Sequence, residues 1–284
     1  MRLFLLTTLV MIALAANSVL NRMAVGVAGL DPGVAGAVRL GAGAVVLLVL
    51  AVWRGGGGVA RPRPAVALTG AGTLFLYIFG FTVANGRIEA GIGALILFGA
   101  VQITMFAAGL WMGERPGAAR WLGAAVAFGG LVVLVAPAGG AGVDPLGVAM
   151  MALGGLGWGL YSLNGRRAGA PLAASAVNFT LALPLALGWV ALRGGGDLTW
   201  GVWPALLSGA VTSGLGYALW YAVVPRLAPS LAAVAQLSVP VLAALGGAMV
   251  LGEVPGGRFW LAAALVLGGI GLALRRPGRS GARG

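Results

Sequence analysis

Long apolar runs alternate along the chain with short segments rich in Gly, Pro and Arg. A helix that crosses the hydrocarbon core of a bilayer needs about 20 residues, because ~30 Å is spanned at ~1.5 Å per residue. Runs of roughly this length lie at residues 3–21, 34–53, 65–84, 91–112, 121–137, 147–163, 174–192, 203–224, 230–251 and 259–274. The gaps between them are too short for a separate water-soluble domain. The pattern therefore predicts an all-α integral membrane protein with ten transmembrane helices.

The composition supports this class and excludes several others. Hydrophobic residues make up 60% of the 284 residues and charged residues only 8%, whereas a soluble domain carries about 25% charged residues. The net charge of +12 comes from arginines in the gaps between apolar runs, so it does not indicate a surface that binds nucleic acid. Cysteine and histidine are absent, which excludes disulfides and thiolate or imidazole metal sites. No cofactor is expected.

The arginines also predict the orientation, because positively charged loops remain in the cytoplasm. With the N-terminus inside, thirteen arginines fall on the cytoplasmic side and four on the other. Both termini are therefore expected in the cytoplasm, as in a multi-pass protein of a bacterial inner membrane. An alternative for the first run is a cleaved secretory signal, with Arg2 in front and Ala13-Leu14-Ala15 as the cleavage site. The apolar segment continues to Leu20, which favours a membrane span instead.

The sequence repeats itself at an offset of 139 residues. Glu114 recurs as Glu253 and Trp121 as Trp260, each within a longer match. The same shift maps Arg54-Gly55-Gly56-Gly57 onto Arg193-Gly194-Gly195-Gly196 and Gly129-Gly130 onto Gly268-Gly269. The predicted organisation is a first repeat at 1–137, a linker at 138–143, a second repeat at 144–275 and a basic cytoplasmic tail at 276–284.

Each repeat contains five predicted spans. Because five is odd, the two halves must enter the membrane with opposite orientations. Inverted repeats of this kind are the architecture of secondary transporters, in which a central site is exposed to each side in turn. The predicted fold is thus ten transmembrane helices arranged as two inverted five-helix repeats.

The chain resembles the drug/metabolite transporter superfamily, EamA type. The resemblance rests on Gly113-Glu114 and Gly252-Glu253 at the ends of spans four and nine, Arg39 early in span two, and Asn17 in span one. It implies transport of metabolites, such as amino acids or related amphipathic compounds, through a central cavity by alternating access. The expected function is an exporter of this kind.

Two other classes of function remain as alternatives. A non-transporting structural subunit of a membrane complex would lack a central cavity and would co-purify with its partner. An intramembrane enzyme is disfavoured because no Ser–His pair, embedded Asp pair or HExxH motif is present.

Four amide side chains inside the spans are candidates for substrate binding, since buried polar groups in membranes face the bundle interior or a hydrated cavity. Asn17 and Asn21 share one face of span one, and Gln102 lies near the middle of span four. Gln236 stands four residues before Pro240, which frees a backbone carbonyl beside it. The alternative is that these amides only hydrogen-bond neighbouring helices.

Arg39 lies about five residues inside span two. Its side chain is expected to extend to the outer membrane surface, and the alternative is an anchor for a substrate carboxylate. Five aromatic residues are candidates for the cavity lining, with an aromatic belt at the membrane interface as the alternative. They are Tyr77, Trp158, Tyr161, Tyr217 and Trp220.

The expected partners are a small-molecule substrate and the lipid bilayer, with no nucleic acid; monomer and homodimer both remain open. No acidic residue lies deep in a predicted span, so a proton-driven exporter of cationic drugs is disfavoured. Glu89, at the outer end of span four beside Arg87, is the one candidate for a proton-linked group. Glu114 and Glu253 are expected to cap a following helix or to pair with an arginine.

Overall fold

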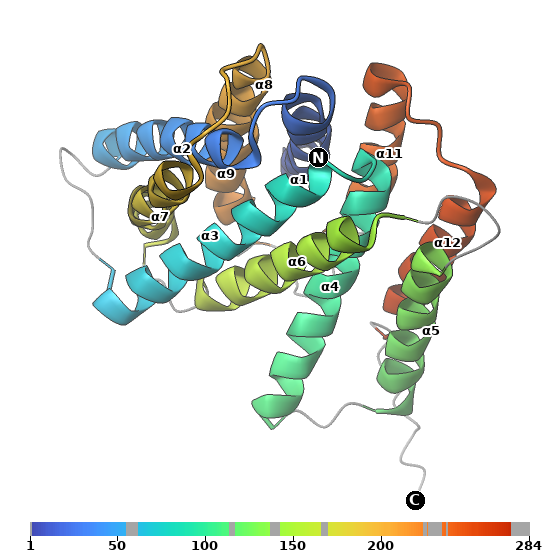
Figure 1. Cartoon of the computed structure of the whole chain (residues 1–284). Coiled ribbons are helices and arrows are strands. Elements are labelled where there is room, and N and C mark those ends of the chain that lie inside the picture. The colour runs from blue at the N-terminus through green and yellow to red at the C-terminus, as the bar shows by residue number, and fades with distance from the viewer. Residues whose placement is uncertain are drawn as a thin grey trace, which may run out of the picture.

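The computed structural model describes residues 2–54, 62–113, 117–136, 143–165, 170–223, 226, 235–236 and 238–273. Across these residues the chain is built from helices and short connections, without strands (Figure 1). The helices are α1 (Arg2–Asn21), η1 (Arg22–Val27), α2 (Pro32–Arg54), α3 (Pro64–Asn85), α4 (Ala90–Trp111), α5 (Ala118–Val135), α6 (Pro145–Gly165), α7 (Pro171–Arg193), α8 (Val202–Leu207), η2 (Ser208–Leu215), α9 (Gly216–Val223), α11 (Ser238–Leu251) and α12 (Gly257–Ala273).

Among the described residues, eight helical segments are long and apolar enough to cross a membrane. Large apolar side chains cover their outward faces, as at Val45, Leu68 and Leu192, which suits contact with lipid rather than water. The chain is therefore a multi-pass membrane protein. The last two of the ten expected spans correspond to α11 and α12, which are apolar but shorter than the other eight. The expected start of span nine and the tail at 276–284 lie outside the described residues.

Proline and aspartate mark the beginnings of several helices. Pro is the first residue of α2, α3, α6 and α7, where the missing N–H costs nothing and the fixed φ suits a helix. Before α2, the carboxylate of Asp31 accepts hydrogen bonds from the N–H groups of Gly33 and Val34. Before α6, the carboxylate of Asp144 accepts one from Gly147. These caps satisfy backbone donors that a helix start leaves unpaired.

Two helices contain π-helical segments. Arg22 was expected in a loop, but α1 continues through it as η1, which ends at Val27. The eighth span runs through α8, η2 and α9, with the π-helical part Ser208–Leu215 in its middle. π-Helical turns insert an extra residue and are frequent at functional sites.

The helices pack in pairs that the 139-residue offset exchanges. α2 packs on α7 and α5 on α12, so helices at equivalent positions of the two predicted repeats meet (Figure 1). The same offset relates two further sets of contacts. α6 packs on α3 as α1 packs on η2 and α9, and α6 packs on α4 as α1 packs on α11. Contacts related in this way are what a two-fold relation between the halves produces.

The glycines at the contact between α5 and α12 show the same exchange in detail. A Cβ on Gly130 would lie 2.9 Å from the backbone nitrogen of Val266. A Cβ on Gly269 would lie 2.5 Å from the backbone nitrogen of Ala127. Adding 139 to 130 and 127 gives 269 and 266, so both contacts join equivalent positions. Glycine is needed at both because the opposing atoms belong to the backbone.

Ionic and polar contacts tie the helices together at one end of the bundle. Arg22, after α1, pairs with Glu253, after α11, at 2.6 Å. Its Nη1 also donates to the carbonyl of Asn85 at the end of α3, over 2.9 Å. The other oxygen of Glu253 accepts a hydrogen bond of 2.8 Å from the N–H of Ala90, the first residue of α4. Glu253 thus pairs with an arginine, as expected, but it caps α4 rather than the helix that follows it. Glu114 lies outside the described residues.

Candidate functional site

Buried polar side chains gather near the middle of the helices. Of the charged side chains that the structure describes, Arg39 alone is buried. It is accompanied by buried amides and hydroxyls, among them Asn17, Ser18, Asn21, Ser208, Thr212 and Ser213. Polar groups inside a bilayer are stable only when other protein groups or a hydrated cavity satisfy them.

Arg39 points into the bundle, so the expectation that it extends to the membrane surface is wrong. Only 1% of the residue is exposed. Its Nε donates to the hydroxyl of Ser213 in η2, and its Nη2 donates to the hydroxyl of Tyr77 in α3, both over 3.0 Å. The guanidinium carbon also lies 5.2 and 5.1 Å from the ring centroids of Tyr77 and Phe81, a distance at which cation–π attraction operates. Interior partners replace the water that a surface position would have supplied.

Asn17 extends this network to α1. Its Nδ2 donates to the Tyr77 hydroxyl over a long 3.4 Å, and its Oδ1 accepts hydrogen bonds from the hydroxyls of Ser208 and Thr212. Together with Arg39, these groups connect α1, α2, α3 and η2. The predicted repeats are thus joined through a polar network at mid-bundle, because η2 belongs to the second and the other three helices to the first.

Four of the five aromatic candidates form a single cluster around Trp158. Its ring centroid lies 5.0 Å from those of Tyr77 and Tyr217 and 5.7 Å from that of Tyr161. The fifth candidate, Trp220, is buried but makes none of these ring contacts. The belt interpretation is wrong for these five residues. It suits exposed tryptophans at helix ends instead, such as Trp53 and Trp111.

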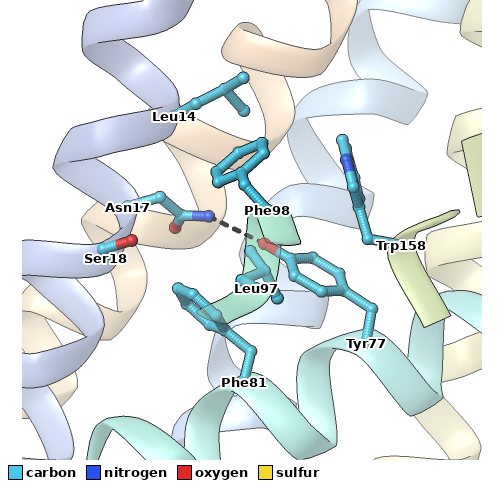
Figure 2. Close-up of a pocket in the computed structure, with 8 residues that line it drawn as sticks. All are labelled: Leu14, Asn17, Ser18, Tyr77, Phe81, Leu97, Phe98 and Trp158. Carbon is cyan, nitrogen blue, oxygen red and sulfur yellow. Dashed lines mark hydrogen bonds between the residues drawn. The ribbon is translucent and has the colours of Figure 1, made fainter. Parts of the chain in front are cut away.

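A small pocket lies beside this network, between α1, α3, α4 and α6 (Figure 2). Its polar side chains are Asn17, Ser18 and Tyr77, and its aromatic walls include Phe98 and Trp158. Leu14, Phe81 and Leu97 complete the lining. In Figure 2 the amide of Asn17 and the hydroxyl of Tyr77 meet across this space. The space has room for about one water-sized molecule.

The remaining sequence candidates lie outside this lining. Asn21 is buried one helical turn from Asn17, and its Nδ2 has no hydrogen-bond partner. Gln102 is half-buried one turn from Phe98. Gln236 is half-buried in the short described stretch at 235–236. The structure therefore brings together Asn17, Arg39 and the aromatic cluster, and neither glutamine is among the described residues that line the pocket.

The hydroxyls of η2 were missed by sequence reasoning. Ser208, Thr212 and Ser213 are buried and bond to Asn17 or Arg39. The spacing of Ser208 and Thr212 was a usable signal, because hydroxyls four residues apart inside an apolar span lie on one helix face. The pocket wall formed by Leu14 and Leu97 carried no such signal, since leucines occur on every face of these helices.

Glu89 stands at the ionic end of the bundle, at the residue before α4. Its neighbour Arg87 pairs with Asp144 at 3.5 Å. Burial and the nearby carboxylate of Glu253 raise the pKa of Glu89, against the lowering effect of Arg22. Among the described residues, no three side chains of the types His, Cys, Asp and Glu are grouped so that they could hold a metal ion.

Three comparisons place the chain among known proteins. The EamA-like transporter family matches at residues 1–136 and 145–275. The uncharacterized protein PA1977 of Pseudomonas aeruginosa is 47% identical over 296 residues, covering 100% of this chain and 98% of that protein. A crystal structure of a protein shares the fold with a TM-score of 0.67 at 24% identity, covering 94% of this chain and 95% of that one.

Proposed function

The chain belongs to the EamA-like transporter family, and we propose that it is a secondary transporter that exports small metabolites, such as amino acids or related amphipathic compounds. Transport proceeds by alternating access around the pocket beside Asn17 and Tyr77. The protein sits in a bacterial inner membrane with both termini in the cytoplasm.

The proposal includes ten transmembrane helices in two inverted five-helix repeats, at 1–137 and 144–275. The exchanged helix pairs and the glycine contacts at Gly130 and Gly269 support it. In such an architecture each half can adopt the conformation that the other has just left, so that two states of similar energy open to opposite sides.

The observation that carries the proposal is the polar network that crosses the interface between the halves. Arg39 and Tyr77 of the first half meet Ser213 of the second at mid-bundle, directly beside the pocket. A packing role alone would be served better by apolar side chains, because buried charges are costly in a membrane. A pocket with room for one water-sized molecule fits a state closed to both sides.

The contacts at one end of the bundle suit an outer gate. By the predicted orientation, Arg22, Glu253 and Ala90 lie on the outer side, where the ion pair joins α1 of the first repeat to α11 of the second. Opening toward the outside requires this pair to separate.

Counterflow in liposomes tests the proposal. Purified protein is reconstituted with a panel of amino acids and related metabolites inside, and exchange with labelled external substrate is followed. Exchange above that of protein-free liposomes is expected, and Tyr77→Phe should weaken it, because Tyr77 lines the pocket. Thr7→Val provides a control, because its hydroxyl bonds only to the carbonyl of Leu3 within α1. Absence of exchange across the panel, together with stable co-purification of another protein, would favour a structural subunit.

A further inference from the structure

Among the residues that the structure describes, no acidic side chain is a partner for the charge of Arg39. Its hydrogen bonds end on the neutral hydroxyls of Ser213 and Tyr77. Its Nη1 is buried without a hydrogen-bond partner. The hydroxyl of Tyr217 lies close enough to interact with this charge, yet it too is buried without a hydrogen-bond partner. A buried cation in this state is stabilised by any anion that can reach it.

Tyr77 links this charge to the pocket. Its oxygen accepts hydrogen bonds from Nη2 of Arg39 and Nδ2 of Asn17, so the hydroxyl hydrogen remains to be donated. Tyr77 itself lines the pocket (Figure 2). Because the oxygen is held by a cation, the O–H group is polarised and becomes a stronger donor.

Asn17 likewise presents donors to the pocket. Its Oδ1 is occupied by the hydroxyls of Ser208 and Thr212, while its Nδ2 has a second hydrogen beyond the one directed at Tyr77. Tyr77 and Asn17 therefore offer hydrogens rather than lone pairs to the pocket, and the hydroxyl of Ser18 can donate as well. No acidic residue lines the pocket to receive an ammonium group.

We infer that this pocket binds the carboxylate of a singly charged organic anion, an assignment of substrate class that rests on the proposed transport function. The carboxylate accepts hydrogen bonds from Tyr77 and Asn17, and its charge neutralises that of Arg39. The apolar part of the substrate packs against Phe98 and Trp158. A cation is repelled by the same charge. A zwitterionic amino acid leaves its ammonium without an acidic partner, so among the metabolites proposed above this pocket favours carboxylates without an amino group.

Ser213 offers a way to remove the anion requirement without touching the pocket lining. Its hydroxyl lies 3.0 Å from Nε of Arg39, so Ser213→Asp supplies the missing carboxylate from within the protein. Ser213→Asn is the matched control, since it has nearly the same size and no charge. The aspartate variant should be as heat-stable as the wild type or more so, because it pairs a buried charge.

The test uses the purified full chain in detergent and measures the unfolding temperature against ligand concentration. The probes, both used at about pH 6, are phenylpyruvate, a monocarboxylate with an aromatic ring, and phenylalaninamide, whose α-amino group is protonated at that pH and makes it a cation of similar shape. Phenylpyruvate should raise the unfolding temperature of the wild type and of Ser213→Asn in a saturable way. Its apparent affinity for Ser213→Asp should be at least about tenfold lower, and phenylalaninamide should have no effect on the wild type.

Two results would overturn the assignment. In the first, phenylpyruvate leaves the unfolding temperature of the wild type unchanged, or phenylalaninamide raises it by the same amount as phenylpyruvate does. In the second, the wild type and Ser213→Asp bind phenylpyruvate with equal affinity. The comparison of the two probes on the wild type stands even where a variant fails to fold. If the protein exchanges neutral or cationic compounds and phenylpyruvate does not affect that exchange, the anion assignment is wrong but the transport function stands. If the protein exchanges none of the compounds, the transport function itself is wrong.

Discussion

The guanidinium of Arg39 and the hydroxyl of Tyr77 meet at 3.0 Å in the middle of the bundle. The first residue lies in α2 and the second in α3. The bond therefore connects α2, through Tyr77, to the pocket between α1, α3, α4 and α6. A buried cation thus acts on the pocket through the phenol group that lines it.

Tyr77→Phe removes the hydroxyl that accepts hydrogen bonds from Arg39 and Asn17. Two buried donors lose their partner, which should lower the free energy of unfolding by about 1–3 kcal/mol and reduce counterflow. Thr180→Val is the control. The Thr180 hydroxyl bonds to the carbonyl of Ala176 within α7, away from the pocket lining, so this variant should retain counterflow. Equal counterflow by the Tyr77 variant and the wild type would contradict the role given to this hydroxyl.

Gly130→Ala and Gly269→Ala test the exchanged packing of α5 and α12. Each added methyl group would meet backbone atoms of the other helix at 3.0 Å or less. Both variants should therefore lower the free energy of unfolding by about 1–3 kcal/mol. Thermal unfolding of the purified protein measures this.

The neighbouring glycines provide the control for that pair. A Cβ on Gly129 or Gly268 has nothing within 4 Å. Alanine there should leave stability unchanged or raise it by up to about 1 kcal/mol, through its higher helix propensity. If all four variants behave alike, the close contact of the two helices is wrong.

Glu253→Gln breaks the ion pair with Arg22, both of whose side chains are at most 19% exposed. Arg22 then keeps its charge without a carboxylate, and we expect a loss of about 1–3 kcal/mol in unfolding free energy. Asp144→Asn is the control, because its pair with Arg87 is longer and more exposed and should be worth less than about 1 kcal/mol. An equal effect of the two substitutions on the unfolding temperature would contradict the special role of the Arg22 pair.

Glu89 predicts a pH dependence of stability. Burial raises its pKa in the folded protein, so folding favours the protonated carboxyl. The contribution to stability is therefore fully present below the unfolded pKa and is lost as the pH rises from about 4.5 through the raised folded pKa. Glu89→Gln should flatten this decline and raise stability at pH 7 by less than about 1 kcal/mol, because the carboxyl is only partly buried. Unfolding temperatures of both proteins between pH 4 and pH 8 test this, and parallel curves would contradict it.

The helical, membrane-spanning nature of the chain followed from its apolar runs, because a span must be long and apolar whatever its neighbours are. The boundaries were less predictable. Arg22 ends an apolar run and reads as a loop residue, but contacts with Glu253 and Asn85 hold it in a helical continuation of α1. Such contacts join residues far apart in the sequence, and a local pattern does not contain them.

The site was predictable in its residue types and less so in its arrangement. Asn17 and Tyr77 stood out as polar and aromatic residues inside spans, and the structure joins them. Arg39 was expected at the surface because its position near the start of a span permits that. Its partner Ser213 is 174 residues away, so only the packing of η2 against α2 decides the direction of the side chain.

Labelling of a single cysteine at Ser18 tests most directly whether the pocket opens to each side of the membrane in turn. The chain contains no cysteine, and Ser18 lines the pocket while only 2% exposed. The Ser18→Cys protein is prepared in two kinds of vesicle, right-side-out and inside-out, and each is exposed to a membrane-impermeant thiol reagent. Alternating access predicts slow labelling from both sides, accelerated from the outer side by Glu253→Gln. Labelling from one side only, or from neither, would contradict it.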